Sequence, residues 1–252
     1  MNFVFDMNNY LHHMQQCEKS KDFCTWINAY QKAVWHRIGY SRSIRGMKVY
    51  ETVITQNLVF DLALKKLPGV KIFESVNERK NGSDLLIEIC CGTKIKRLAV
   101  QAKIAYKNES FPMLDHQVGS VQQIDLLLNY SKLNGYKSAY IFYGYSKSSL
   151  LHDYGISIAD ATHIERKYFI PRPKVTIPKM TDLILDTHCL PAHHEFCCRA
   201  SDSIFNFEEN QEFTKDLNFW KAIEVQTPSA KLLSSNESEG FNPAYLIQVS
   251  GG

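Results

Sequence analysis

Two strands and the turn between them can be recognised in residues 82–103, whose sequence is GSDLLIEICCGTKIKRLAVQAK. The apolar runs predict strands over residues 84–91 and 97–104, and Gly92 begins a turn of hairpin length. Asp84 opens the first strand, and Gln101 and Lys103 close the second. Polar side chains at these places in a sheet are costly unless they contact each other or a metal ion. The hairpin therefore predicts a sheet with a polar site beside it.

A helix is expected before the hairpin, over residues 47–66, and Leu67-Pro68-Gly69 is a strong stop signal. Ile54, Leu58 and Leu62 share its apolar face, and Glu51 lies on the same face. A carboxylate near a helix start is favoured by the helix dipole, by about 0.3–1 kcal/mol. The alternative is that Glu51 is an acidic ligand of the site at Asp84.

The elements around the hairpin predict the fold class. Residues 2–43 are expected to be mostly helical, with one apolar stripe at Trp26, Tyr30, Val34 and Ile38. Further strands are expected over residues 70–76, 139–143 and 155–159, with a helix over about 115–133 between the second hairpin strand and residue 139. This order predicts an α/β protein with a mixed central sheet flanked by helices and with N-terminal helices.

The chain divides into three parts on this interpretation. Residues 1–45 would form a helical segment packed on the core, residues 46–200 the core itself, and residues 201–252 a C-terminal extension. Within the extension, a helix over residues 213–223 and a strand over 245–249 are expected.

Composition sets broad limits on class and compartment. The 252 residues are 44% hydrophobic and 22% charged with a net charge of +3, which suits a soluble globular protein and neither requires nor excludes a nucleic-acid partner. The seven cysteines include two adjacent pairs, Cys90-Cys91 and Cys197-Cys198, which make a poor disulfide framework. No signal peptide is recognisable, and no apolar run approaches the roughly 18 residues of a membrane span. We therefore expect a cytoplasmic protein with reduced thiols.

The polar residues suit phosphodiester hydrolysis. This reaction needs an activated water and stabilisation of the charge on phosphorus, and a divalent ion held by oxygen ligands serves both needs. Asp84 would be the principal ligand of Mg²⁺ or Mn²⁺, with the Gln101 amide oxygen and the Ala102 carbonyl beside it. Glu51 would hold a second ion or a coordinated water, and Lys103 would orient the attacking water. The alternative is a surface hairpin with a solvated Asp, Gln and Lys.

The arrangement resembles the site of PD-(D/E)XK (restriction-endonuclease-like) nucleases, in a variant with Gln at the second acidic position. Over roughly residues 30–200 the chain also resembles an uncharacterised bacterial family of this superfamily, found among candidate anti-phage effectors. The matching segments are Glu51-Thr52, residues 82–84, 100–103, 123–127, 140–143 and 154–159, and Cys197-Cys198.

The resemblance implies a restriction-endonuclease-like fold and a metal-dependent endonuclease that cuts DNA in bacterial antiviral defence. It carries over Glu51, Asp84, Gln101 and Lys103 as catalytic residues, the first three as metal ligands, and adds Gln123 from the following helix. It also implies a regulatory protein or signal from the same defence operon, and homo-oligomers are common in this superfamily. Gln101 lacks the charge of the usual acid, for which Glu88 on the same face would compensate.

Two other classes of function remain open on the sequence. One is a catalytically inactive module of the same fold that binds nucleic acid or a partner subunit. The other is an interaction protein that regulates another toxin or enzyme. Metal-dependent cleavage that requires Lys103 would separate the nuclease from both.

Two further groups of residues have more than one interpretation. Histidines and cysteines between His188 and Cys198 would suit either zinc or simple packing, although their spacing matches no common zinc finger. Scattered basic residues would either follow a phosphate backbone or be solvated; these are Lys94, Lys96, Arg97, Arg166, Lys167, Arg172 and Lys174.

Overall fold

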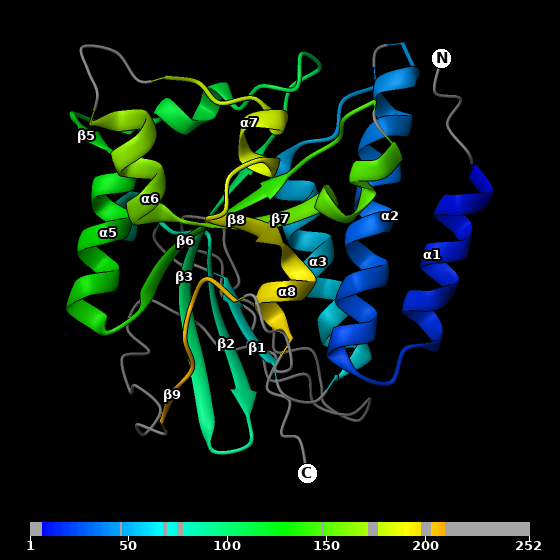
Figure 1. The fold of residues 1–252 in the computed structure, drawn as a ribbon, viewed down its shortest axis with the longest axis horizontal. Coiled ribbons are helices and arrows are strands. Elements are labelled where there is room, and N and C mark those ends of the chain that lie inside the picture. The colour runs from blue at the N-terminus through cyan, green and yellow to red at the C-terminus, as the bar shows by residue number, and fades with distance from the viewer. Residues whose placement is uncertain are drawn as a thin grey trace, which may run out of the picture.

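A mixed β-sheet with helices on both faces organises the protein, as the computed structural model in Figure 1 shows. It describes residues 7–45, 47–67, 70–74, 78–147, 149–170, 176–197 and 203–209. In this part of the chain the sheet has seven strands in the order β1-β2-β3-β6-β7-β8, with β9 paired to β3. The strands are β1 (Val70–Glu74), β2 (Leu85–Cys91), β3 (Lys94–Ile104), β6 (Lys137–Tyr143), β7 (Ile156–Asp160), β8 (Cys189–Pro191) and β9 (Glu208–Glu209).

The helices lie in two groups on opposite faces of the sheet (Figure 1). One face is covered by α2 and α3, with α1 packed outside α2, and the other by α5 and α6. The helices are α1 (Met7–Lys19), α2 (Phe23–Ser43), α3 (Glu51–Lys65), α4 (Glu78–Asn81), α5 (Gln123–Asn134), α6 (Ala161–Ile164), α7 (Met180–Ile184) and α8 (Ala192–Phe196), with short 3-10 helices η1 (Pro112–Asp115) and η2 (Ser149–Gly155) and the π-helical turn η3 (Glu165–Phe169). This arrangement confirms the expected fold class and is compatible with a restriction-endonuclease-like core.

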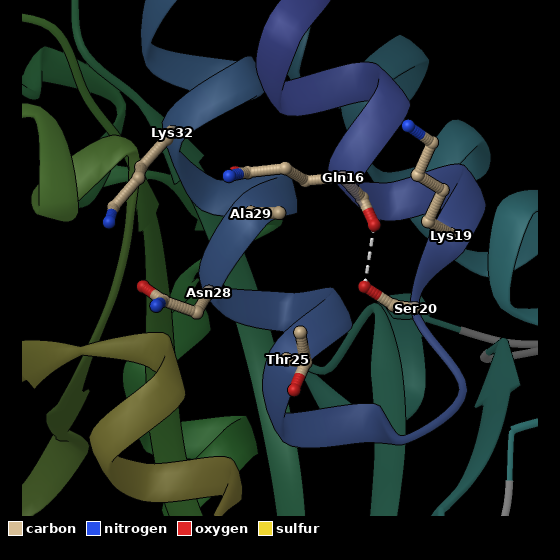
Figure 2. A pocket seen from close by; sticks show the side chains of 7 residues that line it. All are labelled: Gln16, Lys19, Ser20, Thr25, Asn28, Ala29 and Lys32. Atoms are coloured by element: carbon tan, nitrogen blue, oxygen red, sulfur yellow. Dashed lines mark hydrogen bonds between the residues drawn. The ribbon is translucent and has the colours of Figure 1, made fainter.

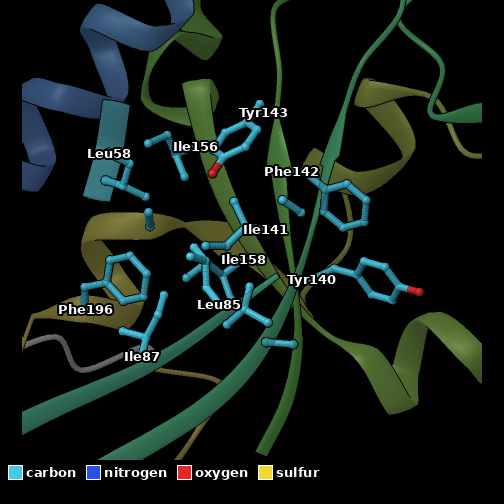
Figure 3. Close-up of a cluster of buried hydrophobic side chains, with 14 of the residues drawn as sticks. Leu58, Leu85, Ile87, Tyr140, Ile141, Phe142, Tyr143, Ile156, Ile158 and Phe196 are labelled. Atoms are coloured by element: carbon cyan, nitrogen blue, oxygen red, sulfur yellow. The ribbon is translucent and has the colours of Figure 1, made fainter. Parts of the chain in front are cut away.

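The core lies between the sheet and the helices. The stripe Trp26, Tyr30, Val34 and Ile38 is buried as expected. Side chains of β6 alternate, so that Ile141 and Tyr143 point toward Leu58 of α3 while Tyr140 and Phe142 point to the opposite face (Figure 3). At the start of α2, Asp22 caps the helix by accepting a hydrogen bond from the Thr25 backbone N–H at 2.8 Å.

The structure corrects several expected boundaries. The helix expected over residues 115–133 begins only at Gln123, because residues 117–122 form a small hairpin of β4 (Gln117–Val118) and β5 (Val121–Gln122). Val118 and Val121 are paired across that hairpin rather than spaced along a helix. The helix expected from residue 47 begins at Glu51, since residues 47–50 are not helical and Tyr50 is its extended N-cap residue.

The cysteines depart from the expectation of reduced thiols at one position. Cys91 is disulfide-bonded, whereas Cys17, Cys24, Cys90, Cys189 and Cys197 form no disulfide. None of the described helices combines the length and the apolar character that crossing a bilayer requires. The helix and strand expected over residues 213–223 and 245–249 lie outside the described residues. The division of the chain at residues 45 and 200 stays a prediction.

Candidate active site

The β2–β3 hairpin brings Asp84 against Gln101. The antiparallel register pairs Leu85 with Val100, and the Asp84 N–H donates to the Val100 carbonyl at 2.8 Å. Asp84 therefore lies opposite Gln101, although they are far apart in sequence. Its Oδ2 accepts from Gln101 Nε2 at 2.5 Å and from the Ala102 backbone N–H at 2.6 Å. These two donors fix the orientation of the carboxylate.

Lys103 is buried two residues further along β3. It is 4% exposed, and its Nζ donates to Oε1 of Gln123 at 2.8 Å. Gln123 is the first residue of α5 and is 1% exposed. Residues 101 and 103 project to the same face of the sheet, which is the face that α5 covers. Gln123, on the helix that follows β3, thus lies in direct contact with Lys103.

Glu51 approaches the same end of β3 from the other face of the sheet. It occupies the first turn of α3, whose next turns bury Ile54 and Thr55. Thr55 Oγ1 and the Tyr143 hydroxyl are hydrogen-bonded at 3.0 Å, which ties α3 to β6. Burial raises the pKa of the Tyr143 phenol, and the negative charges of Glu51 and Asp84 raise it further. One phenol therefore lies within electrostatic range of both carboxylates.

A cavity of about 690 Å³ lies where these elements meet. Glu51, Lys103 and Gln123 all line it, so α3, β3 and α5 each contribute one candidate residue. Asp84 and Gln101 lie next to Lys103 on the hairpin but are not part of the lining. The remaining lining residues come mainly from residues 38–52 and 104–116.

The oxygen atoms near Asp84 fit a divalent ion. Oε1 of Gln101 is a buried acceptor that receives no hydrogen bond from the described residues. Leaving such an oxygen unbonded in the interior costs about 1–3 kcal/mol, which a cation would recover. Mg²⁺ and Mn²⁺ take oxygen ligands, so Asp84, Gln101 and the Ala102 carbonyl are a chemically suitable set. In the described part of the chain no three His, Cys, Asp or Glu side chains converge as a metal-binding group.

Glu88, which was expected to compensate for the missing charge at position 101, lies beside a cation. It is buried and forms an ion pair with Arg97, its direct neighbour across the hairpin, at 3.2 Å. One oxygen of its carboxylate is therefore engaged by Arg97.

The residues between His188 and Cys198 have separate partners. The His188 ring stacks on His163 with centroids 4.1 Å apart, and His193 is hydrogen-bonded through Nδ1 to Gln31 at 2.6 Å. Cys189 is buried in the core, and Cys198 lies outside the described residues. The described members of this group thus favour packing over zinc binding.

The basic residues near the hairpin turn do not form a phosphate-binding stripe. Lys96 and Arg97 are both buried and bonded to carboxylates, Glu195 and Glu88 respectively. Arg172 and Lys174 lie outside the described residues.

A second cavity, of about 360 Å³, lies between α1 and α2 (Figure 2). Most of its lining residues are polar or charged, and Ser20 Oγ donates to the Gln16 carbonyl at the end of α1 at 2.6 Å. None of the candidate catalytic residues lines this cavity. The larger cavity is therefore the candidate active site.

Comparison with known proteins identifies a family for the chain. A family model with the description "Family of unknown function (DUF6615)" matches residues 23–248. The chain belongs to this family. The match begins at the first residue of α2 and includes every candidate residue of the site. No curated protein matches the chain. Since the description of DUF6615 names no activity, the nuclease assignment stays a prediction.

Sequence reasoning missed most of the cavity wall. Arg42, Lys48, Tyr106 and His116 line it but belong to no motif. What these residues share is their place in the chain, since each lies close to the end of a helix or strand beside the cavity. Only the fold brings those ends together.

Proposed function

We propose that this protein is a metal-dependent nuclease that hydrolyses phosphodiester bonds in DNA. The observation that supports it best is that Glu51, Lys103 and Gln123, from three different elements, line one cavity beside the Asp84–Gln101 pair. Buried polar side chains gathered at a cavity are expensive for folding and are typical of catalytic sites.

Each residue has a role in this proposal. Asp84, Gln101 and Glu51 would hold Mg²⁺ or Mn²⁺, which when bound supplies Lewis acidity at the phosphate and lowers the pKa of water. Lys103 would orient the attacking water and balance the charge that develops on the phosphate oxygens. Gln123 keeps the ammonium of Lys103 in place through the 2.8 Å hydrogen bond. Asp84 would in turn hold Gln101, as it does through the hydrogen bond to Nε2.

The wider biological setting rests on the sequence resemblance. We propose that the protein acts in the cytoplasm of a bacterium as an effector of antiviral defence. Under this proposal a regulatory protein or signal from the same operon controls it, and it assembles as a homo-oligomer.

A catalytically inactive DNA-binding or partner-binding module is the second candidate. It is favoured by the neutral Gln101, whose amide is bonded to the carboxylate that would have to hold the ion. Removing one negative charge from a metal site weakens its affinity for divalent cations. In this case the fold and the cavity would serve recognition alone.

The test is cleavage of supercoiled plasmid, single-stranded DNA and RNA in Mg²⁺, Mn²⁺ or EDTA. We expect metal-dependent cleavage of DNA that is lost in Lys103→Ala and kept in Lys132→Ala, an exposed lysine of α5. Cleavage that persists in Lys103→Ala would contradict the proposed site. The nuclease proposal itself would be contradicted by two results together. The wild-type protein would cleave no substrate under any condition, and calorimetry would show Mg²⁺ binding that is unchanged in Asp84→Ala.

A further inference from the structure

The rim of the candidate active site carries large apolar side chains that are exposed to solvent. Tyr50 is 61% exposed and Tyr106 is 48% exposed, and Met47 and Met113 are also exposed. All four line the 690 Å³ cavity. Soluble proteins rarely gather exposed apolar side chains around one hollow unless a ligand covers them. Two of the four are aromatic rings, which suit a flat ligand.

The same cavity is lined by several cations. Arg42, Lys48, Lys103 and Lys107 contribute positive charge to its described lining, and Glu51 contributes a carboxylate. Arg42 is held in position, since its guanidinium donates to the carbonyls of Ala105 and Tyr145 at 2.6 and 3.1 Å. Lys48 and Lys107 are exposed at the rim. The lining therefore favours an anionic ligand that also has apolar surfaces.

The size of the cavity restricts which form of nucleic acid fits. Its volume is in the range of small-molecule pockets, about 300–1,000 Å³. A duplex keeps its bases stacked on one another, so their faces are inaccessible to protein side chains, and only its backbone would contact the rim. An unpaired nucleotide exposes the face of its base, which stacks on aromatic side chains, while its phosphate contacts lysine and arginine.

We infer that the cavity binds unpaired nucleotides next to the bond to be cut, so that the substrate is single-stranded DNA rather than intact duplex. This inference rests on the proposed nuclease function. Tyr50 and Tyr106 provide stacking surfaces, and Lys48 and Lys107 contact the backbone phosphates. Glu51 and Lys103 then lie within the same cavity as the bound strand.

Binding can be measured separately from cleavage. The probe is a fluorescein-labelled single-stranded oligonucleotide, compared with a duplex of the same sequence, by anisotropy in EDTA. We expect the single strand to bind the wild-type protein at least about tenfold more tightly than the duplex. Tyr50→Ala and Tyr106→Ala each weaken single-strand binding about tenfold, as loss of one stacked base does. Phe60→Ala is the matched control, because Phe60 is 58% exposed on α3 but does not line the cavity.

The outcomes distinguish this inference from the proposed function. Equal binding of duplex and single strand, or wild-type affinity in both tyrosine variants with intact thermal unfolding, overturns the inference. If that happens while cleavage still depends on Lys103, the nuclease proposal stands alone. Tyrosine-dependent single-strand binding without any cleavage supports the inference as a binding site and counts against the nuclease.

Discussion

Each end of β3 buries a lysine, and the two lysines are bonded in opposite ways. At the hairpin end, Lys96 Nζ donates to the Glu195 carboxylate at 3.0 Å, to the Glu195 carbonyl at 2.8 Å and to Ser203 Oγ at 2.6 Å. At the other end, Lys103 Nζ donates to the neutral amide of Gln123 and lines a cavity. Both side chains are nearly inaccessible to water.

The bonding of each lysine indicates its role. Burial lowers the pKa of Lys96, and the charge of Glu195 opposes this effect, so the pair can remain charged in the interior. Ser203 also donates to Glu195, and the Ile204 N–H donates to Glu195 Oε1. This network joins α8 and the segment around residue 203 to β3, which is a structural role. Lys103 instead donates to a neutral amide and lines a cavity, so its positive charge is suited to contact with an anionic substrate.

The sharpest test of this contrast is Lys103→Met. Its cleavage rate should fall about a thousandfold, because the charge that contacts the transition state is lost. Its free energy of unfolding should change by only about 1 kcal/mol, because methionine fills the space and the Lys103 ammonium donates to the neutral amide of Gln123. Cleavage of single-stranded DNA in Mg²⁺ or Mn²⁺ and urea unfolding measure the two effects. A variant that unfolds in mild urea would assign Lys103 the same role as Lys96.

Lys96→Met should have the reverse effect. It leaves the Glu195 carboxylate buried without its cation, which costs about 3–5 kcal/mol in free energy of unfolding. The double variant Lys96→Met/Glu195→Gln should recover much of this loss, because the uncompensated charge is gone. Urea unfolding of the two variants provides the comparison. Equal stability of Lys96→Met and the wild type would mean that the pair is not structural.

Gly82→Ala should destabilise the protein by about 2–3 kcal/mol and lower activity. Gly82 has φ +68°, and a Cβ there would lie 2.6 Å from the Gln123 carbonyl oxygen. Relief of this contact moves the start of α5 and with it the partner of Lys103. Gly92→Ala is the control, because Gly92 has φ +59° but no atom within 4 Å of a Cβ. It should cost only about 1 kcal/mol and leave cleavage unchanged.

If Gly82→Ala and Gly92→Ala lose equal stability, then the left-handed backbone alone explains the loss. The close contact of Gly82 with α5 would then not help to position Gln123. Thermal unfolding of both variants and their cleavage of single-stranded DNA decide this.

The smallest effect concerns pH at the structural end. Burial lowers the pKa of His193 to about 4, and its Nδ1 accepts a hydrogen bond from Gln31, which an imidazolium cannot do. As the pH falls from about 6.5 toward 4, the unfolded chain takes up a proton before the folded one, so stability decreases. We expect a loss of about 1 kcal/mol, because His193 is partly exposed.

His193→Gln should flatten this part of the stability curve, measured by urea unfolding at a series of pH values. His12→Gln, on the exposed side of α1, is the control. A curve for His193→Gln with the wild-type slope between pH 6.5 and 4 would contradict the assignment.

The sequence predicted the sheet well where its patterns were local. The apolar runs on both sides of Gly92 gave the hairpin, and the stripe from Trp26 to Ile38 gave the buried face of α2. At the small hairpin over residues 117–122 the sequence pattern predicts helix, because Val121 and Ile124 have helical spacing. Tertiary contacts decide such short segments rather than periodicity.

The candidate site could be predicted only in part. Asp84, Gln101 and Lys103 share one hairpin, so strand pairing alone brings them together. The buried pair of Lys96 and Glu195 joins residues 99 positions apart, and no local sequence pattern predicts it. The same holds for Arg42, whose place in the cavity depends on how α2 packs against the end of β3.

The two-residue turn at Gly92-Thr93 also limits how this hairpin can vary among members of the DUF6615 family. Asp84 faces Gln101 because equal numbers of residues run from each of them to the turn. Adding one residue to each strand lengthens the hairpin and leaves this pairing unchanged. Adding a single residue shifts the register, unless a bulge absorbs it, and turns one of the two side chains to the opposite face. Insertions and deletions in this hairpin are therefore expected to occur in pairs.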